Sequence, residues 1–432
     1  MAYVLAAAAV ALALFVRPSV ARADFRWLDV ALVAYIALTA VQLIPLPAQL
    51  RLGISPAVRR LDLQLRIDAP VNALEDAARP LTVDTDATIQ SLWLGVAVLL
   101  VFWCARSLFA RGGVRAGART IAGLGLATAA FGIAQHATAP RSLYWLRTFR
   151  YTEPFGPYMN RSDFAMWIVM ALPLTGGYLL ARMHSRRDSA AARFSADVFD
   201  DVALFLTVAM GLMVAALMVG LSRSGIIGIA AAAVTLWSLS EARLNRHGRA
   251  RLLAGIAAVA LIGVFYANAS AVATRIADTV DRGMGGRLEI WRTTLPMIRD
   301  FWRAGVGAGG YERAMIVYQP APHETYFNHA HNEYLQVLAE GGLILAIPVA
   351  FAAAFAIAAI RRRLAADRTV TYWVRVGAVS GMVGAAVQSL WETGLRRPAN
   401  MLLFAVLAAF ALQLSSHPSR RADEDPAGVG ER

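Results

Sequence analysis

The feature that most constrains this chain is a repeated alternation of long apolar blocks with short segments rich in arginine. The blocks are about 17 to 20 residues long, the number of helical residues that crosses the hydrocarbon core of a bilayer. Hydrophobic residues make up 58% of the 432 residues and charged residues 16%, whereas soluble domains carry about 25% charged residues. The sequence therefore predicts an all-α, polytopic membrane protein.

The apolar blocks predict about eleven to twelve transmembrane helices. Eleven of them lie near residues 1–16, 27–46, 89–105, 120–136, 163–181, 202–220, 225–240, 252–268, 342–360, 371–390 and 399–416. The first block precedes a small-residue sequence at Ala21–Ala23, as a secretion signal does. Its positive charges follow the apolar run instead of preceding it, so we expect a first span.

These spans divide the chain into four expected parts. They are N-terminal transmembrane helices in 1–268, one large periplasmic loop in 269–330, C-terminal transmembrane helices in 331–416, and a disordered cytoplasmic tail in 417–432. No internal repeat is visible, which weakens a transporter built from inverted halves. The one cysteine, Cys104, lies inside an apolar block, so no disulfide framework exists.

The basic residues predict how the chain is oriented. The net charge is +13 and all 42 basic residues are arginine, but they lie in short loops between apolar blocks, so we expect no nucleic-acid partner. Six alternate segments contain most of the arginine clusters. They contain Arg17, Arg22 and Arg26; Arg106, Arg111, Arg115 and Arg119; Arg182, Arg186, Arg187 and Arg193; Arg243, Arg246, Arg249 and Arg251; Arg361, Arg362, Arg363 and Arg368; and Arg420 and Arg421. The positive-inside rule makes these segments cytoplasmic and leaves 47–88, 137–162, 222–225, 269–330 and 391–398 outside.

The outer loop at 269–330 is much longer than a connection requires, and it is rich in aromatic residues. Within it, Gly286–Phe301 places apolar residues at helical spacing, which predicts an amphipathic helix on the membrane surface. These residues are Leu288, Trp291, Leu295 and Ile298. The glycine-rich Gly305–Gly310 that follows lacks the Lys-Ser/Thr ending of a phosphate-binding loop, which argues against nucleotide binding.

The densest polar cluster begins with His323 and Glu324 and continues from His329 to Gly342. Asn332, Gln336 and Glu340 recur every four residues and so share one face of a helix. Three interpretations of the histidines remain open: a metal site, a histidine satisfied in an interfacial helix cap, or a general base. The metalloprotease spacing is absent, and we expect no metal and no cofactor. Imidazole is suited to take a proton from a hydroxyl near neutral pH.

Three arginines complement this cluster. Arg223 lies between two spans, where an idle charge is costly, although snorkelling to the interface is the alternative. Arg287 and Arg161 also lie in outer segments, and either could be a solvated surface charge. Together, three guanidinium groups and a histidine cluster suit a doubly charged anionic headgroup, because guanidinium binds phosphate oxygens bidentately.

Four motifs in residues 150–345 resemble, in order, those of the bacterial O-antigen ligase and polymerase superfamily. They are Phe155-Gly156-Pro157-Tyr158-Met159-Asn160-Arg161-Ser162-Asp163-Phe164-Ala165; Ser222-Arg223-Ser224-Gly225; Gly286-Arg287-Leu288-Glu289-Ile290-Trp291 with Gly305-Val306-Gly307-Ala308-Gly309-Gly310-Tyr311; and His329-Ala330-His331-Asn332-Glu333-Tyr334-Leu335-Gln336. The match is strongest at the last motif. Ser162-Asp163 stands where family members often have His or Asn.

The resemblance implies a metal-independent, inverting glycosyltransferase of the bacterial inner membrane, with its active site facing the periplasm. The family's donor is a glycan on undecaprenyl diphosphate. By the same resemblance His331 would deprotonate the acceptor hydroxyl, while Arg223 and Arg287 would hold the diphosphate. We expect Arg161, Asn160, His329 and Asn332 to contribute to substrate binding, with His329 as the alternative base.

Three acidic residues lie near these motifs: Glu333, Glu340 and Glu392. Any of them could orient His331 by accepting a hydrogen bond. For each one taken singly, we expect a carboxylate on a helix surface without that role.

The leading function is O-antigen ligation to lipid A-core, with extension of a lipid-linked glycan by a polymerase as the alternative. A protein acceptor is less expected, because no extra domain follows the last span. A transporter or flippase would need acidic residues near mid-membrane, and the spans contain almost none. A non-catalytic scaffold would leave the outer Arg and His cluster unexplained. The expected partners are the lipid-linked glycan, its glycan acceptor and membrane lipid.

Overall fold

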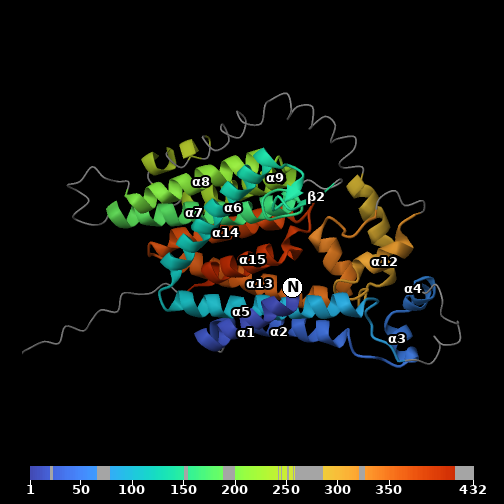
Figure 1. The fold of residues 1–432 in the computed structure, drawn as a ribbon. Coiled ribbons are helices and arrows are strands. Elements are labelled where there is room, and N and C mark those ends of the chain that lie inside the picture. The colour runs from blue at the N-terminus through green and yellow to red at the C-terminus, as the bar shows by residue number, and fades with distance from the viewer. Residues whose placement is uncertain are drawn as a thin grey trace, which may run out of the picture.

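Long helices run side by side through most of the molecule, and short helices gather at one end (Figure 1). The computed structural model describes residues 1–19, 23–65, 78–149, 154–187, 200–241, 243–244, 246–250, 253–255, 257, 286–320 and 326–413. The long apolar helices are α1 (Ala2–Val16), α2 (Arg26–Val41), α5 (Thr85–Ala110), α6 (Val114–Thr138), α7 (Arg161–Arg187), α8 (Asp201–Val219), α9 (Arg223–Glu241), α13 (Glu333–Ala366), α14 (Thr371–Gln388) and α15 (Pro398–Leu412).

The remaining elements are short. They are η1 (Ala23–Phe25), α3 (Ala48–Ile54), α4 (Val58–Gln64), β1 (Ser142–Leu143), β2 (Arg147–Thr148), α12 (Tyr311–Tyr318) and η4 (Gly394–Arg396). The two strands pair antiparallel, with Ser142 opposite Thr148, in the turn between α6 and α7. Residues 286–300 are also helical.

The predicted fold class is confirmed. Among the described residues, six helices are long and apolar enough to cross a membrane, namely α5, α6, α7, α8, α9 and α13, and α1 and α15 are shorter apolar helices. Helices α2 and α14 occupy the positions of the predicted spans at 27–46 and 371–390. Most of the predicted span at 252–268, the start of the large loop, and the whole tail at 417–432 lie outside the described residues.

Large apolar side chains point outward from the surrounding helices. Exposed examples are Val4 and Phe15 on α1, Leu204 and Val208 on α8, Val234 on α9, and Phe351 and Ile357 on α13. Such a continuous apolar exterior is what a lipid-facing surface requires, and water would disfavour it.

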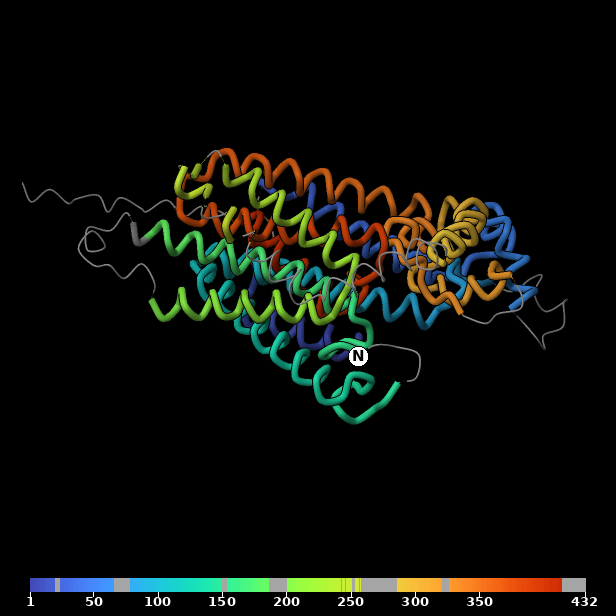
Figure 2. Tube along the Cα trace, turned by 90° about the horizontal axis from the view of Figure 1, so that it is seen from above, coloured from blue at the N-terminus to red at the C-terminus, as the bar shows by residue number. Residues whose placement is uncertain are grey.

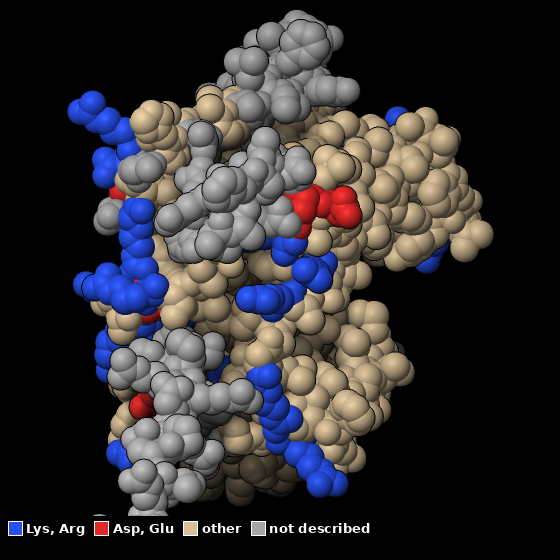
Figure 3. All heavy atoms as spheres, turned by 90° about the vertical axis from the view of Figure 1, so that its left-hand side faces the viewer, with Lys and Arg blue, Asp and Glu red and all other residues tan. Residues whose placement is uncertain are grey.

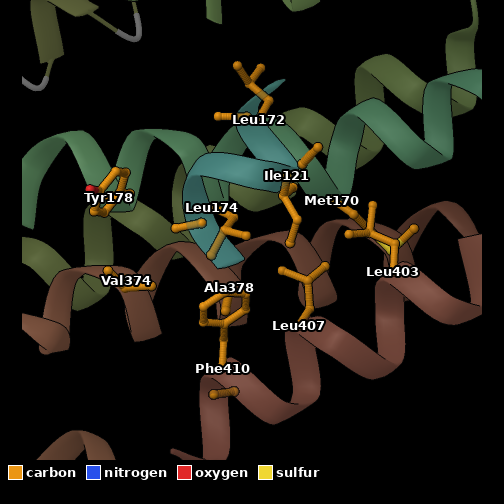
Figure 4. Close-up of a cluster of buried hydrophobic side chains, with 14 of the residues drawn as sticks. Ile121, Met170, Leu172, Leu174, Tyr178, Val374, Ala378, Leu403, Leu407 and Phe410 are labelled. Carbon is orange, nitrogen blue, oxygen red and sulfur yellow. The ribbon is translucent and has the colours of Figure 1, made fainter. Parts of the chain in front are cut away.

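Helix α7 lies at the centre of the bundle and packs most closely on α14. A Cβ atom added at Gly177 would overlap the carbonyl oxygen of Trp373, and one added at Gly377 would overlap that of Pro173. The two backbones therefore touch, as small residues allow in membrane helices. Figure 4 shows the neighbouring core, where Leu174 of α7, Ala378 of α14 and Phe410 of α15 lie close together.

A second, smaller core lies at the end of the bundle that holds α3, α4 and α12. It buries apolar side chains from α4, the helix at 286–300, α12 and the start of α13. The largest contributions come from Leu61, Met297, Phe301 and Tyr311. Figures 1 and 2 both place these segments beside one another although more than two hundred residues separate α4 from α12.

The helix predicted at Gly286–Phe301 forms, and it has a buried face in addition to the predicted apolar one. Leu288 and Leu295 are 41% and 53% exposed. Ile290, Thr294 and Met297 are buried, because this helix packs against the small core as well as presenting a face outward.

Arginines gather at the end of the bundle opposite α3, α4 and α12, which Figure 3 faces. Arg111 follows the last residue of α5, Arg182 lies in the last turns of α7, and Arg363 lies in the last turn of α13. Alternating loops therefore return to the same end.

Candidate functional site

Four helix termini meet at the end of the bundle opposite the arginine-rich end. Helices α7, α9 and α13 begin there, and α14 ends there. Arg161 is the first residue of α7 and Arg223 the first of α9, whereas Asn332 is the N-cap of α13. The motifs predicted from sequence are thus brought to one side by the alternation of helix directions.

Asn332 connects the start of α13 to the end of α14. Its Oδ1 accepts hydrogen bonds from the backbone N–H groups of Tyr334 (3.0 Å) and Leu335 (3.1 Å), as an N-cap asparagine does. Its Nδ2 donates to the carbonyl oxygen of Leu390 at 3.1 Å. Both ends of the amide are therefore engaged within the protein, and they fix the backbone next to His331.

His331 faces a buried carboxylate that lies just after α14. Its Nδ1 is 3.4 Å from Oε2 of Glu392, whose side chain is only 5% exposed, whereas the His331 side chain is 32% exposed. The backbone of His331 has φ of 47°, a left-handed conformation that is uncommon for a residue with a Cβ. This backbone turn directs the imidazole toward Glu392.

Glu392 also binds Arg287. The guanidinium Nη2 of Arg287 donates to Oε1 of Glu392 at 2.5 Å, and the hydroxyl of Ser224, next to Arg223, lies 3.4 Å from the same oxygen. Three segments predicted to act together therefore meet at a residue that none of the four motifs contains. Arg287 retains 30% side-chain exposure, so part of its guanidinium faces outward.

The charge of Glu392 decides the hydrogen-bonding state of His331. Burial alone would raise the pKa of Glu392, but the hydrogen bond from His331 and the charge of Arg287 outweigh it, so the pKa is lowered. An ionised carboxylate only accepts hydrogen bonds, so Nδ1 of His331 carries the proton. In a neutral imidazole the other ring nitrogen, Nε2, then has the lone pair that can accept a proton.

His329 has a different environment. Burial, together with the charges of Arg396 and Arg397 and of His331, lowers the pKa of His329 to about 3. Its Nδ1 is buried and has no hydrogen-bond partner among the described residues. His329 is therefore neutral near pH 7 and a very weak base.

The residue between the two histidines is held on both sides. The N–H of Ala330 donates to Oε1 of Gln336 at 2.6 Å, and its carbonyl accepts from the indole N–H of Trp291 at 3.0 Å. Because Gln336 belongs to α13 and Trp291 to the helix at 286–300, this clamp fixes the His331 segment relative to Arg287.

An ion-pair network of largely buried side chains connects the start of α13 to the segment before α15. Arg396 lies 3.2 Å from Glu333 and 2.8 Å from Glu340, and Gln336 donates to Glu340 at 2.9 Å. Burial would lower the pKa of Arg396, but Glu340 and Glu333 outweigh it and raise the pKa. The network therefore keeps its cation charged.

Helix α13 breaks just after Glu340. Gly342 has φ of 52°, and the backbone of the glycine-rich segment passes so close that a Cβ at Gly305 would overlap Glu340. The backbone N–H groups of Val306 and Gly307 donate to the carbonyls of Ala339 and Glu340 at 2.9 Å each. Gly305 therefore allows this segment to lie directly against the backbone of α13.

A second carboxylate–arginine pair lies beside His331, at the start of α7. Nε of Arg397 donates to Oδ2 of Asp163 at 2.6 Å, and Asn400 donates to the carbonyl of Asp163 at 2.9 Å. Asn160 accepts from the N–H of Ser162 at 2.9 Å and so caps this turn, in which Arg161 is half-buried. Arg397 keeps 43% of its side chain exposed.

The described residues hold no cluster of three or more His, Cys, Asp or Glu side chains that could bind a metal ion. The part of the cluster at His323 and Glu324 lies outside them.

Residues 208–350 match the family model described as O-antigen ligase. This match supports the O-antigen ligase superfamily for the chain. No curated protein matches the chain.

The region that the family model matches contains Arg223, Arg287 and His331. Residues Asn160 and Arg161 lie before it, and Glu392, Arg396 and Arg397 lie after it. The structure thus completes the matched region with residues from the two flanking segments.

Sequence reasoning misjudged one of the three acidic residues, Glu392. The expectation that Glu392 is an idle surface carboxylate is wrong, because it is buried and contacts both His331 and Arg287. Glu333 and Glu340 contact Arg396 and not His331. One pattern could have found them: Glu392, Arg396 and Arg397 concentrate charge in a very short outer connection.

Proposed function

We propose that this protein is a metal-independent, inverting glycosyltransferase that moves a glycan from undecaprenyl diphosphate to an acceptor hydroxyl at the periplasmic face of the inner membrane. Its superfamily consists of ligases and polymerases that act on lipid-linked glycans, and this general type of function follows from the family match. What we propose beyond that general function is the donor, the acceptor and the role of each residue.

The observation that carries the proposal is the contact of His331 with Glu392. A general base must present an unprotonated nitrogen to the acceptor hydroxyl, and Glu392 leaves Nε2 in that state by accepting from Nδ1. When Nε2 takes the proton, the buried carboxylate stabilises the imidazolium that forms. His329 lacks such a carboxylate, and its pKa of about 3 makes it a poor base.

The transfer itself is a single displacement. The acceptor oxygen attacks the anomeric carbon as its proton passes to Nε2 of His331, and the bond from that carbon to the diphosphate oxygen breaks. The electron pair leaves with undecaprenyl diphosphate, so the configuration at the anomeric carbon inverts. The proton on His331 then passes to solvent or to the leaving diphosphate.

The arginines supply stabilisation of the leaving group. Negative charge develops on the diphosphate in the transition state, and fixed cations there lower the barrier. Arg287 uses one N–H for Glu392, and a guanidinium has five N–H donors, so it can bind a phosphate oxygen from the same position. Arg223 lies one residue from Ser224, which contacts the same carboxylate. Arg161 begins the adjoining helix α7, and Arg397, the N-cap of α15, pairs with Asp163 in the first turn of α7.

We also assign some roles differently from the sequence-based expectation. Asn332 and Asn160 hold backbone turns with their side chains, so we assign them to positioning His331 and Arg161. His329 is assigned to the wall of the site and not to proton transfer.

The test is reconstitution of the purified full chain with a lipid-linked glycan and candidate acceptors, in the presence of chelator. Transfer that persists in chelator and is lost in His331→Ala and in Arg223→Ala supports the proposal. Transfer that survives His331→Ala removes the base. Offering lipid A-core in one arm and a second lipid-linked glycan in another separates ligase from polymerase.

A further inference from the structure

A hollow of about 500 Å³ opens at the arginine-rich end of the bundle, far from His331, between the start of α2 and the last turns of α13. It is lined by Asp24, Phe25, Trp27, Ala359, Arg362, Arg363 and Ala366. We propose that this hollow binds the headgroup of an anionic phospholipid from the leaflet at that end, with the phosphate held by Arg362 and Arg363.

The charges of the lining favour an anion. Two guanidinium groups face a single carboxylate, and guanidinium geometry matches phosphate oxygens. Arg363 donates to Asp24 at 2.8 Å, but the Asp24 side chain is 65% exposed, so this ion pair is weak and exchangeable. Arg362 forms no ion pair with any carboxylate in the described part of the chain.

The apolar part of the same surface favours a lipid over a free phosphate ion. Trp27 is exposed and stacks on Phe355 of α13, with ring centroids 6.5 Å apart and planes 20° apart. Phe351 and Ile357 are exposed on the same helix. Tryptophan prefers the interface between headgroups and acyl chains, so the surface offers cations to a phosphate and aromatic rings to the chains below it.

The position and the size of the hollow agree with this occupant. Arg26 lies over the ring of Trp27, with its guanidinium carbon 4.8 Å from the centroid, which adds a third cation at the rim. Small-molecule sites occupy roughly 300 to 1,000 Å³, and this volume lies within that range. Basic hollows between membrane helices at the headgroup level are suited to anionic lipid headgroups.

The test is native mass spectrometry of the purified full chain with phosphatidylglycerol or phosphatidylcholine, each titrated in detergent. We expect selective retention of phosphatidylglycerol, and binding weakened at least about tenfold in Arg362→Gln/Arg363→Gln. The matched control is Arg361→Gln/Arg368→Gln, which removes the same charge from exposed positions outside the lining. We expect the control to bind within about twofold of the unaltered protein.

A second variant tests the proposal in the opposite direction. Asp24→Asn removes the carboxylate that competes for Arg363, so it should strengthen phosphatidylglycerol binding about threefold or more without deleting any cation. Equal retention of the two lipids would overturn the proposal. Equal losses in the double variant and its control would also overturn it, as would displacement of phosphatidylglycerol by millimolar inorganic phosphate, which identifies a free-phosphate site. Because lipid retention is measured without any glycan, failure here leaves the proposed transfer reaction unaffected.

Discussion

Nδ1 of His331 lies 3.4 Å from Oε2 of Glu392, a residue 61 positions further along the chain on the other side of two helices. Glu392 also receives the guanidinium of Arg287. A single buried carboxylate thus joins the proposed base to a proposed phosphate ligand, and it sets the distance between them.

Glu392→Gln should lower the rate constant kcat about 10- to 100-fold with a smaller change in KM. Glutamine keeps the size of the side chain but removes the charge that stabilises the imidazolium of His331. Steady-state kinetics on the reconstituted protein measures both constants. Glu289→Gln, on the exposed surface of the helix at 286–300, is the control and should leave kcat within about twofold of the native value.

The same variant should show a pH-dependent stability difference. The folded-state pKa of Glu392 is lowered, so its ionisation stabilises the native state above the unfolded-state pKa and is lost as pH falls through the lowered folded-state value. The difference in Tm between native protein and Glu392→Gln should therefore be largest near neutral pH and shrink in acid. A constant difference across the range would contradict a charged Glu392.

His331→Gln should reduce transfer by about 10² to 10⁴, the usual contribution of a positioned general base. His329→Gln is the matched comparison two residues away and should cost less than about tenfold, because a histidine with a pKa of about 3 does not supply proton transfer. Single-turnover transfer assays distinguish the two. Equal losses in the two variants would assign the proton transfer to neither residue alone.

Arg287→Lys should weaken transfer although the positive charge remains. Lysine cannot bridge Glu392 and a phosphate oxygen at the same time as a guanidinium does, so we expect kcat/KM to fall about tenfold or more. Arg292→Lys, on the same helix and one and a half turns later, is the control. The measurement is the dependence of rate on donor concentration, and an unchanged kcat/KM would remove Arg287 from donor binding.

Gly305→Ala should destabilise the protein by about 2 kcal/mol or more and lower transfer with it. The residue has φ of 67°, and an added Cβ would overlap the backbone of Glu340, so both strain and collision act. Gly211→Ala, where nothing lies within 4 Å of the added atom, is the control and should be neutral or slightly stabilising. Thermal unfolding in detergent compares the two.

The spans could be predicted from the sequence because bilayer thickness imposes a length on each apolar block. Helices α5, α6, α7, α8 and α9 begin and end within several residues of the predicted blocks, and the arginines lie at the expected end. Motif residues at the opposite end could likewise be placed on one side, since alternation of spans brings every second connection together.

The partner of His331 could not be predicted in the same way. Nothing in the local pattern around Glu392 indicates that it contacts a histidine 61 residues earlier. That contact depends on how α13 and α14 pack against each other. The protein-facing side of the helix at 286–300 was missed for a related reason. Its partners, such as Leu61 and Tyr311, come from two other segments, and periodicity alone cannot distinguish a protein-facing side from a lipid-facing one.

The contact between Gly177 and Gly377 makes the site sensitive to mutations that lie far from it. The two helices joined there carry Asp163 at the start of α7 and Glu392 just beyond the end of α14. A larger side chain at either glycine would tilt one helix against the other and separate those carboxylates. Loss-of-function alleles are therefore expected at Gly177 and Gly377, in the interior of the two helices, at positions that never meet a sugar or a phosphate.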